Sequence, residues 1–191
     1  MKIKQNKSGL ILTEALLAIA MLSIGSLVLA SIIQNAVRTT ALSKNYLIAQ
    51  NLATEGMETI KSVRDTNWLL QADEPECWLE KEPDIGGDIC LDVMMEGGSY
   101  LPQENGGKWK MVDGTGVLNL EDGDDPEYQM HVEDGRYSYN VIGEPTIFYR
   151  GINVVSMVGT DYAVFEVVVE WKEGQKVRSL KRDLLLYNFN Q

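Results

Sequence analysis

The sequence has few of the residues that most enzymes and metal sites need. It contains one histidine, His131, and two cysteines, Cys77 and Cys90. These three side chains cannot complete a tetrahedral zinc site without additional carboxylate ligands. The sequence also has no glycine-rich phosphate loop and no nucleophile elbow. We therefore expect a protein that is not an enzyme and that has no cofactor.

Basic residues are also scarce. The chain has 17 Lys and Arg against 28 Asp and Glu, for a net charge of −11. Lys2, Lys4 and Lys7 precede the first acidic residue, so the remainder has 17 − 3 = 14 basic residues against 28 acidic ones. An acidic domain repels the phosphate backbone and gains nothing from counterion release. This excludes direct nucleic-acid binding by the bulk of the protein.

Proline is absent before Pro75, so nothing interrupts a helix in the first third of the chain. Residues 10–33 are an apolar segment of 24 residues with a single charge, Glu14. About 20 apolar residues are enough for a helix to cross a bilayer. The lysines before this segment predict a cytoplasmic N-terminus, with the bulk of the chain on the other side.

Residues 34–68 continue the helical period but are amphipathic. Apolar residues recur every three or four positions, with charged and polar residues between them. We therefore predict one continuous helix whose first half is in a membrane or filament core and whose second half packs on a globular head. The predicted packing face is Leu42, Tyr46, Ala49, Ala53, Met57, Ile60 and Val63.

Glu14 needs an explanation, because an ionised carboxylate within an apolar helix costs several kcal/mol unless it is paired or neutralised. One reading is that Glu14 reaches water at the cytoplasmic interface. The other interpretation is that Glu14 gains a partner when the nine residues before Leu10 are removed. Cleavage after Gly9 would create an amine on Leu10, four residues before Glu14. In a bundle of subunits, this amine could neutralise the carboxylate of a neighbour and determine the axial register.

The sequence Lys7-Ser8-Gly9 followed by residues 10–20 (LILTEALLAIA) resembles the class III signal sequence of type IV pilins and type II secretion pseudopilins. The resemblance implies a leader at residues 1–9, cleavage after Gly9 by a prepilin peptidase, N-methylation of Leu10, and a role for Glu14 in subunit docking. Leu10 stands where the family usually has Phe or Met.

The same resemblance implies the partners and the location of the protein. The partners would be the peptidase, other pilin subunits, an inner-membrane assembly platform and the membrane. The protein would be a single-pass cell membrane protein that then enters an extracellular or periplasmic filament. Residues 46–68 and the Phe148-Tyr149-Arg150 segment further resemble minor, modification-type prepilins.

Two alternatives use the same N-terminal residues. Val28-Leu29-Ala30 before Ser31 loosely fits a signal peptidase site, which would make the chain an ordinary secreted protein. Against this, secretory apolar regions are usually shorter and lack a carboxylate, and the helical pattern continues past the site. The second alternative is a single-pass membrane protein that does not polymerise and has an exported ligand-binding ectodomain.

Residues 69–136 form an acidic stretch rich in Gly, Asp, Glu and Pro, which predicts long loops with a few short strands or turns. If this part is exported, Cys77 and Cys90 favour a disulfide over two free thiols. Carboxylates are densest at residues 121–127, where Asp122, Asp124, Asp125 and Glu127 are weak candidates for calcium ligands. Their spacing does not match an EF-hand, and we favour a solvated acidic turn.

Residues 137–191 alternate between apolar and polar positions, which predicts about four antiparallel strands. We expect the segment from Lys172 to Gln175 to form a hairpin turn. The expected fold is therefore α+β, with a long N-terminal helix packed on a C-terminal sheet. The residues expected on the apolar faces of these strands are Tyr137, Tyr139, Val141, Ile152, Val154, Ala163, Phe165, Val167, Val169, Trp171, Leu180, Leu184 and Leu186.

Overall fold

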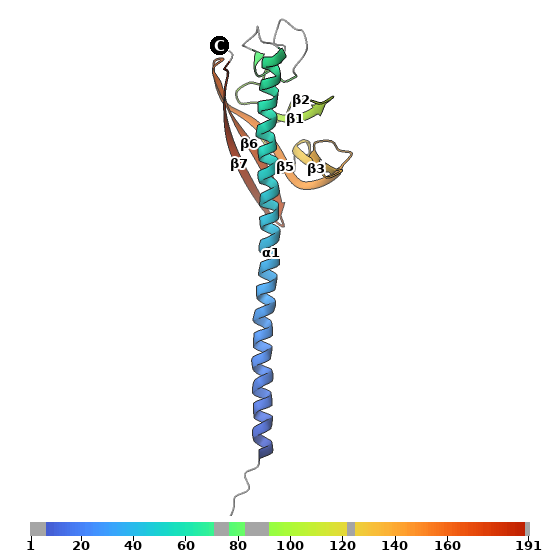
Figure 1. The fold of residues 1–191 in the computed structure, drawn as a ribbon, viewed down its shortest axis with the longest axis vertical. Coiled ribbons are helices and arrows are strands. Elements are labelled where there is room, and N and C mark those ends of the chain that lie inside the picture. Colours follow the sequence, from blue (N-terminus) through green and yellow to red (C-terminus); the bar gives the residue numbers. More distant parts are fainter. Residues whose placement is uncertain (1–6, 71–76, 83–91, 122–124, 190–191) are drawn as a thin grey trace, which may run out of the picture. The chain divides into compact units, whose positions relative to one another are not determined.

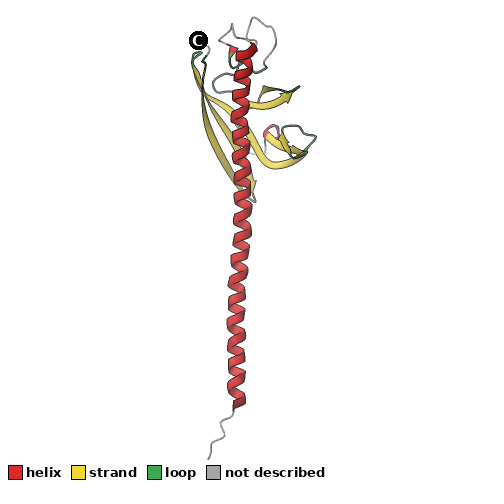
Figure 2. Cartoon of the chain, viewed as in Figure 1, coloured by secondary structure: helices red, strands yellow, loops and turns green. Residues whose placement is uncertain are grey.

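A computed structural model describes residues 7–70, 77–82, 92–121 and 125–189. The chain divides into two compact units, Met1–Leu47 and Ile48–Gln191. The described residues contain one long α-helix, α1 (Lys7–Leu70), and one antiparallel sheet of seven strands (Figure 2). The predicted α+β class and the predicted long N-terminal helix are confirmed.

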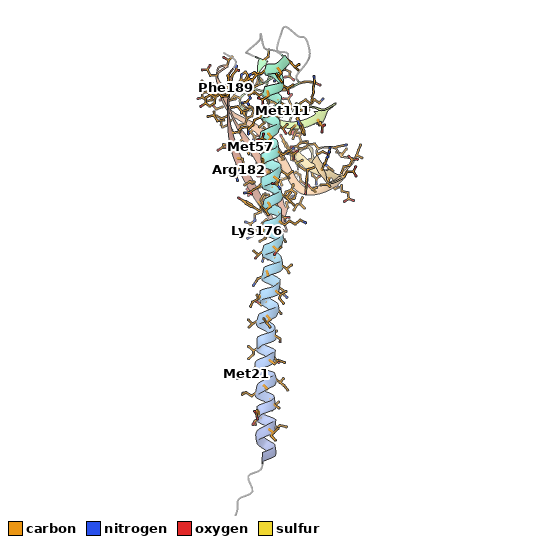
Figure 3. The ribbon with its side chains drawn as sticks, viewed as in Figure 1. Met21, Met57, Met111, Lys176, Arg182 and Phe189 are labelled. Atoms are coloured by element: carbon orange, nitrogen blue, oxygen red, sulfur yellow. The ribbon has the colours of Figure 1, made fainter. Side chains whose placement is uncertain are left out.

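In the second unit, α1 buries one side from Ile48 to Leu70. The buried positions on this side recur every one, three or four residues, as expected for a helix packed on a sheet. They are Ala49, Leu52, Ala53, Gly56, Thr59, Ile60, Val63 and Asn67. The predicted face is confirmed at four of its positions, Ala49, Ala53, Ile60 and Val63, whereas Met57 is half-buried (Figure 3).

Gly56 allows α1 to approach the sheet closely. A Cβ atom built at this position would lie 3.0 Å from Cγ1 of Val167 and 3.6 Å from Cδ of Arg150. Such a contact is tight for any side chain, so a glycine at this position lets α1 pack against Val167 without a steric clash.

Three long strands form the main part of the sheet. β5 (Glu144–Val158), β6 (Tyr162–Glu173) and β7 (Lys176–Tyr187) are joined in sequence as an antiparallel meander (Figure 1). The predicted turn between β6 and β7 is confirmed, with Gly174 at φ +64°. The predicted inward residues of β6, from Ala163 to Trp171, are all buried in the core cluster that also contains the α1 face.

The sheet has seven strands rather than the predicted four or so, because β1 (Ser99–Asn105), β2 (Lys108–Asp113) and β3 (Gln129–Glu133) also belong to it. β1 and β2 form one hairpin within the region predicted to be loop-rich. β3 and β4 (Arg136–Ser138) form a second hairpin. β4 ends at Ser138, and Val141, which was predicted to lie on the apolar face of this strand, is outside it and 78% exposed.

The sheet divides at one edge of β5. One edge pairs with β6 from Phe148 to Val158, while the other edge pairs with two hairpins in turn. β3 pairs with β5 between Glu144 and Tyr149, and β1 pairs with β5 at Ile152 and Asn153. Arg150 and Gly151 lie between these two segments, so both hairpins diverge from β5 at this point (Figure 1).

The face of the sheet opposite α1 is partly covered. Leu118, Leu120 and Tyr128, from the segment that follows β2 and from the short 3-10 helix η2 (Pro126–Tyr128), are buried with Val168 and Tyr149 of the sheet. The carboxylate of Glu170 accepts a hydrogen bond of 2.8 Å from the backbone N–H of Leu120. The acidic middle of the chain therefore supplies a second, smaller core.

The C-terminal end of β7 packs on the end of α1. Nε1 of Trp68 donates a hydrogen bond of 3.0 Å to Oδ1 of Asn188. The rings of Trp68 and Phe189 meet edge to face, with centroids 6.0 Å apart. Phe189 is nevertheless 74% exposed, although its ring also lies 5.9 Å from the ring of Tyr187.

Candidate functional site

The first unit contains the part of α1 that is apolar on every side. Between Ile11 and Val37 its large aliphatic side chains are 54% to 77% exposed, Met21 among them (Figure 3). A helix with such a surface is not stable in water unless lipid or other helices cover it. By length and composition α1 could cross a membrane once.

Two hydroxyl groups in this segment bond back to the helix itself. Oγ of Ser23 donates to the carbonyl oxygen of Ile19 at 2.8 Å, and Oγ of Ser26 donates to that of Ser23 at 2.9 Å. Side chains that bond back to their own helix do not present an unpaired donor to the surroundings. This arrangement suits an apolar environment, where each unpaired polar group would cost several kcal/mol.

Glu14 is the one charged residue between Lys7 and Arg38, and its side chain is exposed on α1. Within the described residues it makes no ion pair or side-chain hydrogen bond. The carboxylate therefore lacks a cationic partner in the described part of a single chain. A partner for it in an apolar environment has to come from the undescribed N-terminal residues or from another molecule.

Gly9 and Leu10, the predicted cleavage site, lie in the first turns of α1. The first four N–H groups of any helix have no partner within the helix, so this end is the part most easily unwound. The predicted leader is residues 1–9, and residues 1–6 lie outside the described part of the chain. The predicted cleavage and methylation therefore stay predictions.

The predicted disulfide and calcium sites fall partly outside the described residues. Cys77 is fully buried and is not a free thiol, while Cys90 lies outside the described part. Of the calcium candidates, Asp122 and Asp124 also lie outside it. The pairing of the cysteines stays a prediction.

The two remaining calcium candidates, Asp125 and Glu127, are described. Burial, followed by the charge of Glu127, raises the pKa of the Asp125 carboxyl above its ordinary value. Oε1 of Glu127 accepts hydrogen bonds of 2.6 Å from the N–H and the hydroxyl of Thr115. No group of three or more metal-ligating side chains occurs among the described residues.

Sequence reasoning did not find a buried charge cluster at the point where the sheet divides. Arg150 is 1% exposed, and its Nε donates to the hydroxyl of Tyr139 at 2.9 Å. Nη1 of Arg150 donates to the carbonyl oxygen of Leu52 at 3.0 Å and lies 3.5 Å from Oε2 of Glu55. The Tyr139 hydroxyl in turn donates to the carbonyl oxygen of Arg150 at 2.8 Å, which compensates for the missing strand partner at this edge.

The cluster shifts the acid–base equilibria of its members. Burial raises the pKa of the Tyr139 phenol, although the nearby guanidinium of Arg150 opposes this. Burial alone would lower the pKa of Arg150, but Tyr139 and Glu55 outweigh burial and raise it. Both groups therefore keep their ordinary protonation states at neutral pH, a neutral phenol beside a guanidinium cation. An arginine inside the strand-like segment that starts at Phe148 was the only sequence signal for this cluster.

Comparisons of the chain with protein-family models, with curated proteins and with solved structures found no match.

Proposed function

We propose that this chain is a pilin-like structural subunit, of the minor pilin or pseudopilin kind, which is cut after Gly9 and assembles through its N-terminal helix into a pilus or pseudopilus. The observation that carries the proposal is a helix segment that is apolar on every side and contains one carboxylate, Glu14. Cleavage after Gly9 would place Glu14 at the fifth position of the processed chain.

The physical argument concerns where this surface can be covered. In the single chain, the aliphatic side chains from Ile11 to Val37 are exposed, so they require lipid or other helices. A lipid environment leaves Glu14 as an uncompensated charge, which costs several kcal/mol. A bundle of processed subunits satisfies both requirements, because it covers the aliphatic surface and supplies the amine of Leu10 as a cation.

The proposal predicts the N-terminus of the mature protein. Mass spectrometry of the protein isolated from its native cells should find a chain that begins at Leu10. A chain that begins at Met1 or Ser31 would refute processing at Gly9. The first outcome would favour the single-pass membrane protein that does not polymerise, and the second an ordinary secreted protein.

Substitutions at Glu14 test the docking role separately. Glu14→Ala and Glu14→Gln should both leave the chain in the membrane, because removing a charge makes insertion of an apolar helix easier. Both should reduce the fraction of subunit recovered in sheared filaments, since neither side chain can neutralise an amine. Thr13→Ala, a change at the neighbouring position of α1, is the matched control. Normal assembly of the Glu14→Gln variant would contradict the role of the charge.

A further inference from the structure

A pocket of about 820 Å³ lies in the second unit, at the point where the two hairpins diverge from β5. Pockets that hold small ligands usually have volumes of about 300–1,000 Å³. Residues of β1 and β2 line one side, β4 and the residues that follow it line another, and Arg150 and Glu55 complete the lining. The pocket uses only residues of the second unit, so it does not depend on filament assembly.

The charged groups of the pocket are balanced. Arg136 and Arg150 contribute two positive charges, and Glu55 and Glu104 contribute two negative charges. Two arginines disfavour a cationic ligand and two glutamates disfavour an anionic one. The net charge of −11 of the whole chain further disfavours an anionic ligand. The electrostatics therefore select a neutral ligand that offers both hydrogen-bond donors and acceptors.

Arg150 is held with part of its guanidinium available to a ligand. Its Nε and Nη1 bond to Tyr139 and to the carbonyl oxygen of Leu52, while Nη2 makes no hydrogen bond to a described residue. An arginine carries five N–H donors in a fixed planar arrangement. An acceptor in the pocket that reached Nη2 would therefore be bound with good directionality.

Aromatic rings provide the apolar part of the same pocket. Trp109, Tyr137 and Tyr139 all contribute to the lining, and each is partly buried. Their positions are restrained, because the ring of Tyr137 packs edge to face on Phe148 at 6.3 Å and that of Tyr139 lies 5.3 Å from the Arg150 guanidinium. Rigid aromatic faces beside directed polar groups match a pyranose ring, which has an aliphatic face and a rim of hydroxyls.

An added peptide strand is a poorer occupant. The carbonyl oxygen of Ser99 accepts a hydrogen bond from the N–H of Gly114, so the backbone groups of Ser99 point toward β2. Successive residues of a strand direct their N–H and C=O groups to opposite edges. The backbone groups of Pro102 and Glu104 therefore point to the other edge of β1, which faces the pocket. Proline has no N–H, so a peptide that paired with this edge would lose a ladder hydrogen bond. Proline on an open strand edge is typical of edges that resist strand addition.

We propose that this pocket binds a neutral oligosaccharide, with Trp109 and the tyrosines packed against the sugar rings. Arg150, Arg136 and the two glutamates hydrogen-bond the hydroxyl groups. The proposal goes beyond the filament function and holds whether or not the protein polymerises.

The experiment uses the full chain in a detergent without a sugar headgroup, such as a polyoxyethylene ether, because maltoside or glucoside headgroups would compete. An array of neutral and sialylated oligosaccharides identifies bound sugars, and titration of the best neutral sugar while tryptophan fluorescence is recorded gives its Kd. Trp109→Ala should raise this Kd at least tenfold. Because Trp109 also contacts the core, Arg136→Ala at an exposed position is the second variant, and it should raise the Kd several-fold. Lys108→Ala, an exposed cation next to Trp109 that does not line the pocket, is the matched control.

Binding of a neutral oligosaccharide that both pocket variants weaken and that Lys108→Ala preserves would support the proposal. Three results would overturn it. These are no binding of any neutral oligosaccharide on the array, binding of sialylated sugars alone, and a Kd that Arg136→Ala leaves unchanged while the thermal midpoint shows that the variant is folded.

Discussion

Glu55 and Arg150 allow a quantitative test of how this fold stabilises a buried charge. The side chain of Arg150 is 1% exposed and that of Glu55 is 41% exposed, and Nη1 of Arg150 lies 3.5 Å from Oε2 of Glu55. At an effective dielectric constant of about 20, unit charges at this separation attract each other by about 5 kcal/mol. Since Glu55 is partly solvated, we expect less than half of this. Glu55→Gln should lower the free energy of unfolding by about 2 kcal/mol.

The assay is urea unfolding of the full chain in detergent micelles, followed by tryptophan fluorescence. All four tryptophans belong to the second unit, so the signal reports the unfolding of the unit that contains the pair. Glu55→Gln should shift the urea midpoint downward with an unchanged slope, because the surface exposed on unfolding stays the same.

Glu58→Gln is the matched control, one turn further along the same helix. Glu58 pairs with Lys61 at 2.7 Å, but these side chains are 62% and 36% exposed. Exposed pairs of this spacing contribute about 0.5 kcal/mol or less. Equal losses for Glu55→Gln and Glu58→Gln would refute the reasoning, because they would mean that the burial of Arg150 does not strengthen its pairing.

Arg150→Met separates the charge from the packing. The substitution keeps the aliphatic volume and removes the two hydrogen bonds to Tyr139 and Leu52, which lowers the free energy of unfolding. It also removes a buried charge, which partly offsets this loss. We expect a loss below about 2 kcal/mol. In this background Glu55→Gln should have almost no effect, since Glu55 then has no cation to compensate. A second loss of about 2 kcal/mol would show that Glu55 stabilises another group.

Two further predictions concern packing and pH. Gly56→Ala should lower the free energy of unfolding by about 1–3 kcal/mol, despite the better helix propensity of alanine, because its Cβ would lie 3.0 Å from Val167. Nζ of Lys81 lies 2.8 Å from Oδ1 of Asp92 and 2.6 Å from Oδ1 of Asp113. Burial lowers the pKa of Lys81, but its bonds to these carboxylates outweigh burial and raise it. The contribution of Lys81 to the free energy of unfolding is therefore complete below the pKa of lysine in the unfolded chain, about 10.4. It is lost as the pH rises through the higher pKa of Lys81 in the folded protein.

Controls for these predictions come from the same chain. Gly25→Ala places a Cβ with nothing within 4 Å, so it should leave the urea midpoint of the second unit unchanged. A comparable loss in both glycine variants would contradict the packing argument. Lys81→Met should lower stability at pH 8 and flatten the decline of the urea midpoint above pH 10.4. The same decline in that variant would assign the pH dependence to other groups.

The parts of the fold that sequence patterns predicted well are those with a long, regular period. The apolar segment at residues 10–33 and the three-or-four spacing from Ala49 to Val63 led directly to α1. The alternation from Ala163 to Trp171 led to β6 and its buried face. In each case the pattern repeats the geometry of one element, so no knowledge of distant neighbours is needed.

The pairing of short strands into two hairpins was not predicted, because these strands show no clean alternation. The turns nevertheless carry the right residues: Gly106 and Gly107 join β1 to β2, and Asp134 and Gly135 join β3 to β4. All four have positive φ, from 49° to 82°, as two-residue hairpin turns require. The Gly-Gly and Asp-Gly pairs are therefore the sequence signal from which both hairpins could be predicted.

Local periodicity and hydropathy depend only on neighbours along the chain, so they were enough to predict the long helix, its apolar half and the single charge of that half. The position of the buried charge in the second unit depends instead on tertiary contacts. Arg150, Tyr139 and Glu55 come from a central strand, the segment after a short hairpin, and α1. They meet because β5 runs past the end of one hairpin and the start of the other. Long-range strand pairing of this kind has no local signature. The pocket at the point where the two hairpins diverge from β5 could therefore not be predicted from the sequence.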